Sequence, residues 1–351
     1  MELSQNEIYQ LFFEGTPSFF SVIDTGRNDA DFRTALFVTA SSGDRYVIKL
    51  ADNDFTSPDR IRVWQRCAEE YRKLGYYCPR ILADRSGAFP TVEYKGRKCA
   101  AYAEEFSPYR PLEDREEQGD DGVSAGSGNY LDDIWTMTAR MAAKHFDYAP
   151  FPSAWCLFET FCPSDPCDEV LDNARAWKKY CDTLPEAFRD QVARIWNRWL
   201  ENRNELEKVY HLLPSSVFQA DLNSSNILLD RDGKFVGICD FNLCGREVFL
   251  NYLMRENFDD FEPELESIKK ALQIAARSYT FSDTEKQAAL MLYRCLKPLW
   301  YNKLENLQEA KNDPEATRRC LDLTEKYQTM DIDFPAFMVV PGDAVTGVGS
   351  L

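Results

Sequence analysis

A short polar stretch flanked by two apolar runs constrains this chain more than any other feature. Residues 218–230 read Phe-Gln-Ala-Asp-Leu-Asn-Ser-Ser-Asn-Ile-Leu-Leu-Asp, and residues 238–242 read Ile-Cys-Asp-Phe-Asn. Asp221 stands five residues before Asn226, and the second apolar run ends in Asp240. Such a stretch is either an ordinary β-hairpin with polar turns or a loop built for chemistry. The rest of the chain has to decide between the two.

The order Asp, Asn, Asp is typical of a phosphoryl-transfer site. In such sites one Asp orients the acceptor group, while an Asn and a second Asp hold Mg²⁺ through the hard oxygen ligands that this ion prefers. The spacing therefore makes Asp221 the candidate catalytic residue, and Asn226 and Asp240 the candidate metal ligands.

Three strand-like runs near the N-terminus support this interpretation; they cover residues 19–23, 36–39 and 46–50. The polar turn at residues 25–29 holds a single glycine, so a phosphate cradle and a plain hairpin turn stay equally open there. Lys49 stands inside the third run, and burying an unpaired ammonium is costly. We therefore expect Lys49 to be paired at a cleft and to hold nucleotide phosphates, unless the run is an edge strand.

A partner for Lys49 is expected on the next helix, predicted over residues 59–74. On its helical wheel Glu70 lies at one margin of the apolar face and is the preferred candidate, because its carboxylate would form an ion pair. Gln65 lies at the other margin and is the alternative, giving a weaker neutral contact.

An apolar strand over residues 99–103 leads out of this first part of the chain. In a kinase the main chain at this exit holds the adenine ring, and Glu104 and Phe106 occupy the corresponding positions here. Because such contacts use main-chain groups, the side chains specify them only weakly.

The chain divides into two parts and a tail. We expect a nucleotide-binding lobe at residues 1–109, a catalytic and substrate lobe at residues 110–335, and an irregular tail at residues 336–351. Residues 113–129 are acidic and glycine-rich and are expected to form a mobile loop. Residues 150–167 are rich in aromatic side chains and either wall a substrate pocket or pack between helices. Further helices are expected at residues 131–146, 171–184, 185–212, 263–278, 282–309 (interrupted at Pro298) and 314–330.

Composition excludes several classes of function. The net charge of −17 argues against nucleic acid and anionic membranes as partners. No apolar run approaches the roughly 18 residues that span a bilayer, and the polar N-terminus does not look like a signal peptide, so we expect a cytoplasmic protein. Two histidines and eleven cysteines without a CxxC pair indicate neither a zinc site nor a disulfide framework.

Taken in order, these features resemble the aminoglycoside/choline phosphotransferase family, the small-molecule branch of the protein-kinase-like fold. The family's loop His-Gly-Asp-Leu-x-x-x-Asn is matched by residues 219–226, and the start of its metal motif by residues 238–242. The resemblance implies a two-lobed α+β fold, with a small antiparallel β-sheet lobe and a larger, mainly helical lobe. It also implies ATP and Mg²⁺ as cofactors and transfer of the γ-phosphate to a hydroxyl of a small molecule. The acidic chain mildly favours an acceptor that bears an amine.

Two departures from the family pattern keep alternatives open. Gln219 replaces the family's His, whose role is to brace the loop by hydrogen bonding; Gln can donate and accept. Asn242 stands where many relatives carry a second acid, which weakens a second magnesium site. A nucleotide-binding protein without activity therefore remains an alternative. A protein kinase is the other, although the chain lacks a Gly-rich loop, Asp-Phe-Gly and Ala-Pro-Glu.

Overall fold

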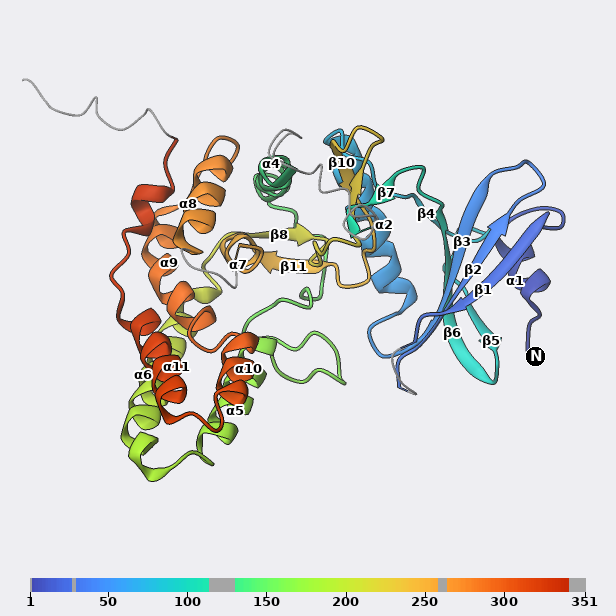
Figure 1. Ribbon diagram of the computed structural model, residues 1–351. Helices are drawn as coiled ribbons and strands as arrows, with labels where there is room; N and C mark the ends of the chain where they lie inside the picture. The colour runs from blue at the N-terminus through green and yellow to red at the C-terminus, as the bar shows by residue number, and fades with distance from the viewer. Residues whose placement is uncertain (1, 27–29, 114–129, 258–263, 341–351) are drawn as a thin grey trace, which may run out of the picture.

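The computed structural model describes residues 2–26, 30–113, 130–257 and 264–340. Its antiparallel sheet comes from the first part of the chain and its helices mainly from the second, which confirms the predicted α+β class (Figure 1). The predicted turn at residues 25–29, the acidic segment 113–129 and the tail 336–351 lie partly outside the described residues.

The first sheet has the order β1-β2-β3-β6-β4, with β5 paired to β6, and each pairing is antiparallel. Side chains alternate between the two faces of a strand, so its register decides what each face carries. Lys49 is opposite Tyr102, and Val47 is opposite Glu104. These four side chains therefore share one face. The strands are β1 (Phe19–Asp24), β2 (Phe32–Thr39), β3 (Arg45–Asp52), β4 (Ile81–Leu82), β5 (Thr91–Tyr94) and β6 (Arg97–Glu105).

Helix α1 (Gln5–Phe12) covers the opposite face of this sheet (Figure 1). It begins at a capping box, in which the Ser4 side chain accepts from the Glu7 N–H and the Glu7 side chain accepts from the Ser4 N–H. Its buried residues Ile8 and Phe12 belong to a core with strand residues of the outer face, including Leu36, Ile48 and Leu50.

Helix α2 (Pro58–Lys73) lies between the sheet and the second part of the chain (Figure 1). Ser57 caps its N-terminus and Pro58 occupies the first turn, where proline is well tolerated. Its apolar side chains are part of the core of the second part, not of the core under α1. Cys67 Sγ lies 4.0 Å from the carbonyl oxygen of Val217, for example.

Two small sheets carry the stretch that opened the sequence analysis. One has the order β10-β9-β7 and the other pairs β11 with β8. Gly237 in β10 lets the strand touch the chain after α2: a Cβ there would lie 1.8 Å from the carbonyl oxygen of Tyr77. The strands are β7 (Arg110–Pro111), β8 (Ser215–Phe218), β9 (Ile227–Leu229), β10 (Phe235–Ile238) and β11 (Gly245–Val248).

Helices make up most of the remaining second part. The helix predicted over residues 282–309 divides on either side of Pro298, because proline cannot donate its main-chain hydrogen bond. The helix predicted to reach residue 146 ends at Ala142, before His145 with φ 47°. The helices are α4 (Tyr130–Ala142), α5 (Glu169–Cys181), α6 (Arg189–Tyr210), α7 (Phe249–Arg255), α8 (Glu264–Ala275), α9 (Asp283–Leu296), α10 (Tyr301–Glu309) and α11 (Pro314–Thr329), with 3-10 turns at Glu186–Phe188 and Phe334–Phe337.

Within the described residues, no helix combines the length and the apolar character that crossing a bilayer requires.

Candidate active site

The ends of three strands bring the candidate residues together. Asp221 and Asn226 lie on the loop between β8 and β9, and Asp240 lies two residues after β10. Two residues in this region have left-handed backbone conformations, Ala220 with φ 64° and Asp240 with φ 55°. Such conformations are strained for residues other than glycine, and they persist only where surrounding contacts hold them.

Gln219 supplies those contacts. Its Nε2 donates to the carbonyl oxygens of Asp221 at 2.9 Å, Cys239 at 2.9 Å and Asp240 at 2.6 Å. Its Oε1 accepts from the Asp221 N–H at 2.7 Å, and the residue is fully buried. The side chain therefore uses both its donor and its acceptor to tie the Asp221 loop to the end of β10.

The Asp221 carboxylate is held by two amides. Oδ1 accepts from Asn223 Nδ2 at 2.9 Å, and Oδ2 accepts from Asn226 Nδ2 at 3.2 Å. Both donors are amide groups, and together they fix the carboxylate in position. That arrangement suits a group that must receive or orient a proton.

A second carboxyl group, which the sequence analysis did not single out, lies beside this loop. The Leu222 N–H donates to Glu256 Oε1 at 3.3 Å. Burial raises the pKa of Glu256 to about 8; the hydrogen bond from Leu222 opposes the shift and the nearby Asp221 carboxylate adds to it. The only sequence signal for this residue is its place at the end of the apolar run after Val248, which says nothing about a partner 34 positions earlier.

Asn226, Asp240 and Asn242 offer oxygen atoms of the kind that Mg²⁺ prefers. Asn242 Nδ2 donates to Asp240 Oδ2 at 3.3 Å, while the buried Asn242 Oδ1 has no hydrogen-bond partner in the part of the chain that the structure describes. The described residues contain no group of three or more His, Cys, Asp or Glu that could hold a metal. The residues present therefore fit a divalent cation held by one carboxylate, amide oxygens and ligands from outside the protein.

Lys49 extends from β3 to this group. Its Nζ forms ion pairs with Glu104 Oε2 at 2.9 Å and with Asp240 Oδ1 at 3.4 Å. Burial on its own lowers the pKa of the ammonium, but the carboxylates of Asp240 and Glu104 outweigh it, so the pKa of Lys49 lies well above its ordinary value. Lys49 is therefore a permanent cation that joins the sheet to the end of β10.

The expectation that Lys49 pairs with a residue of α2 is corrected by the structure. Among the described residues, the ion-pair partners of Lys49 are Glu104 and Asp240, whereas Glu70 pairs with Lys73 at 2.8 Å. The alternative, Gln65, donates to the carbonyl oxygen of Ile81 at 2.7 Å. A helical wheel gives the margins of the buried face, but not which neighbouring element that face meets. Here it meets the core of the second part of the chain.

The exit of β6 also differs from expectation. The Phe106 N–H, expected to be open for an adenine, donates to the carbonyl oxygen of Arg45 at 3.0 Å. Its ring lies 3.7 Å from the Arg45 guanidinium carbon. Glu104 turns its carboxylate to Lys49. Contacts from Phe106 to a base are therefore left to its carbonyl oxygen and its ring.

A cleft of about 980 Å³ lies between these elements. Val47, Glu104 and Phe106 line it from the sheet side, and Leu228 and Cys239 line it from the β9–β10 side. Both lobes thus contribute apolar surface next to the charged group of Lys49 and Asp240. A planar base beside phosphates would match this division.

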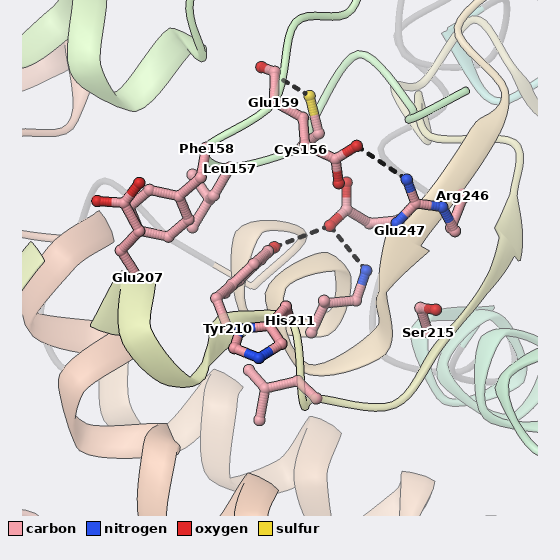
Figure 2. A pocket seen from close by; sticks show the side chains of 12 residues that line it. Cys156, Leu157, Phe158, Glu159, Glu207, Tyr210, His211, Ser215, Arg246 and Glu247 are labelled. Atoms are coloured by element: carbon pink, nitrogen blue, oxygen red, sulfur yellow. Dashed lines mark hydrogen bonds and ion pairs between the residues drawn. The ribbon is translucent and has the colours of Figure 1, made fainter. Parts of the chain in front are cut away.

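A second cavity, of about 310 Å³, is lined by residues that include Tyr210, Arg246 and Glu247 (Figure 2). It lies at the Ser215–Val248 end of the β8–β11 pair, and Asp221 follows the opposite end. Its floor carries Glu247, which is 2% exposed and accepts from Tyr210 Oη at 3.1 Å and Ser153 Oγ at 2.7 Å. Burial raises the pKa of Glu247, and the hydrogen bonds from Ser153, Asn251 and the Val248 N–H oppose the shift. Phe158, from the aromatic segment 150–167, packs against Tyr210 with ring centroids 5.2 Å apart and also lines the cavity.

Comparisons with known proteins agree with this fold. The model of a family described as "Phosphotransferase enzyme family" matches residues 25–249. The amicoumacin kinase hAmiN, solved with AMP-PNP, Ca²⁺ and Ami, has a TM-score of 0.52 at 14% identity, covering 92% of this chain and 91% of that one. An aminoglycoside phosphotransferase from Alicyclobacillus acidocaldarius has a TM-score of 0.50 at 14% identity, covering 96% and 95%. No curated protein sequence matches the chain.

Proposed function

Because the chain belongs to the phosphotransferase enzyme family, we propose that it transfers the γ-phosphate of ATP to a hydroxyl group of a small molecule. The observation that carries the proposal is one connected set of contacts. Lys49 pairs with Asp240 at 3.4 Å, and Gln219 binds the main chain of both Asp240 and Asp221. A phosphate-binding cation, a metal-binding acid and a base are thereby fixed relative to one another, as in-line transfer requires.

Each residue has a distinct role in this proposal. Asp221 accepts or orients the proton of the acceptor hydroxyl, a contribution of about 10²–10⁴ in rate. Asn226 and Asp240 hold Mg²⁺, with Asn242 Oδ1 as a further oxygen; the metal would neutralise phosphate charge and align the phosphates. Lys49 binds the phosphates from the sheet side. Phe106 borders the nucleotide at the exit of β6. Glu104 lies beside it and acts through the ion pair of its carboxylate with Lys49.

An acceptor that bears an amine fits the acidic character of the chain, which carries a net charge of −17. The names of the two structural neighbours, an amicoumacin kinase and an aminoglycoside phosphotransferase, support an acceptor of this general type.

The test is a screen for phosphoryl transfer from ATP, and in parallel from GTP, to a panel of amino alcohols and aminosugars with Mg²⁺. Asp221→Asn is expected to lower kcat by about 10²–10⁴ while the thermal shift produced by AMP-PNP and Mg²⁺ is kept. Asp232→Asn, the same change at an exposed position of the β9–β10 turn, is the control and is expected to act like the wild type.

The alternatives give different results. A nucleotide-binding protein without activity would show the thermal shift but no transfer to any acceptor. A protein kinase would phosphorylate polypeptides and leave the small molecules unchanged. Unchanged turnover in Asp221→Asn would remove Asp221 from the catalytic role.

A further inference from the structure

The carboxylate that holds Lys49 comes from the sheet itself. Glu104 is opposite Val47, two positions along β3 from Lys49, so the two side chains lie on one face as diagonal neighbours. Their charged atoms are 2.9 Å apart. Both residues belong to hydrogen-bonded strands of one sheet, and their spacing is therefore set by the register of β3 and β6.

Burial of the Glu104 carboxylate also requires that a cation pair with it. The side chain of Glu104 is 10% exposed, and a carboxylate in that setting is costly unless a cation meets it. Burial raises the pKa of Glu104 and the Lys49 ammonium opposes that shift. Within the described ranges, Lys49 is the cation that forms an ion pair with Glu104.

Side chains of helix α2 contact groups other than Lys49. Its Glu70 pairs with Lys73 on the same helix, and its Tyr71 ring lies 6.0 Å from the ring of Phe241, the residue after Asp240. Its Arg66 guanidinium lies 4.0 Å from the ring of Tyr148. The helix thus packs on the second part of the chain and, through Trp64 and Tyr102, on the sheet, while Lys49 pairs with Glu104 and Asp240.

We propose that Glu104 is the positioning residue for Lys49: it keeps the ammonium on the sheet so that Asp240 stays available to the metal. This inference rests on the function proposed above. Lys49 has two carboxylates in reach, Glu104 at 2.9 Å and Asp240 at 3.4 Å. Without the nearer one the ammonium pairs with Asp240 alone and competes with Mg²⁺ for that carboxylate.

The experiment compares Glu104→Gln with Glu70→Gln. The two changes are chemically identical, and the two side chains are similarly buried, at 10% and 14% exposed. The readout is the thermal shift produced by a fixed concentration of AMP-PNP as Mg²⁺ is titrated. Glu104→Gln is expected to raise the half-saturating Mg²⁺ concentration about fivefold or more and to lower kcat, whereas Glu70→Gln stays within about twofold of the wild type.

Combining Glu104→Gln with Lys49→Met gives a double-mutant cycle for this pair. If Glu104 acts through Lys49, Glu104→Gln has no further effect on the Mg²⁺ requirement in the Lys49→Met background. Glu104→Asp, which keeps the charge on a shorter side chain, is expected to fall between the wild type and Glu104→Gln. Equal behaviour of the Glu104→Gln and Glu70→Gln variants, or an undiminished effect of Glu104→Gln in the Lys49→Met background, overturns the proposal.

Melting without ligand separates this inference from the proposed function. The Tm changes of Glu104→Gln and Lys49→Met are expected to be non-additive by about 2 °C or more, while those of Glu70→Gln and Lys49→Met add. A wild type that shows no shift with AMP-PNP refutes the nucleotide site and with it the proposed role of Glu104 toward the metal. Additive Tm changes refute the Glu104–Lys49 pair whether or not nucleotide binds.

Discussion

The raised pKa of Glu256 predicts how the stability of the protein depends on pH. Its pKa is raised from 4.5 to about 8, so between these values the folded protein keeps a proton that the unfolded chain releases. Stability therefore falls as pH rises through this window, by up to about 1.4 kcal/mol per pH unit for one group. Glu256→Gln is expected to remove that contribution, measured as a flatter dependence of the urea unfolding free energy on pH between 5 and 8.

Glu309→Gln, at an exposed carboxyl at the end of α10, is the charge control for this experiment. The prediction fails if Glu256→Gln and Glu309→Gln show the same pH slope as the wild type.

Single residues also show which contacts can be predicted from the sequence and which cannot. The chemistry of Gln219 is evident from its side chain, since an amide can donate and accept, and the structure shows both contacts. The partner of Lys49 is not evident, because a pairing between β3 and β6 depends on strand order and register. Glu256 gives no local signal at all: its contact with Leu222 is created by the position of α7 over the loop.

At the scale of elements, sequence patterns are sufficient to predict features that form between residues close together in the chain. The capping boxes at Ser4 and Ser282 follow directly from the Ser-x-x-Glu pattern of the sequence, because each is completed within four residues of the chain. The strand-like runs at the N-terminus became β1, β2 and β3 with longer bounds, since pairing extends a strand into polar neighbours. What α2 packs against could not be derived, because amphipathicity defines a face and not its partner.

The contact between β10 and the chain after α2 is a second testable element. The Tyr77 N–H donates to the Val236 carbonyl at 2.8 Å, and the Ile238 N–H donates to the Tyr77 carbonyl at 3.0 Å. Gly237→Ala would place a methyl group against main-chain atoms that cannot move aside, so we expect a loss of about 2 kcal/mol or more in the free energy of unfolding. Lys234→Ala, an exposed change in the same hairpin, is expected to stay within about 0.5 kcal/mol in urea unfolding. Comparable unfolding midpoints for the two variants would contradict the close approach.

At the scale of the whole molecule, two apolar cores lie on opposite faces of the sheet. One lies under α1 on the outer face, and the other joins the inner face, including Tyr102, to α2 and the helices of the second part. Lys49 and Glu104 belong to the sheet, whereas Asp221 and Asp240 belong to elements packed on the second core. The reacting groups are thus divided between the sheet and the second part, and α2 packs on the second core.

This division predicts a pattern of hydrogen exchange. Ile8→Ala removes a fully buried side chain from the core under α1, and Met141→Ala removes one from the core that contains α2. Changes of this kind cost about 2–5 kcal/mol and lower the protection of the amides that depend on the affected core. Ile8→Ala is therefore expected to speed amide exchange in β1, β2 and β3 while α2 keeps its wild-type protection. Met141→Ala is expected to speed exchange in α2 and α4 and to spare β1 and β2. Equal loss of protection in α2 and β2 on Ile8→Ala would contradict this prediction and mean that both cores open together.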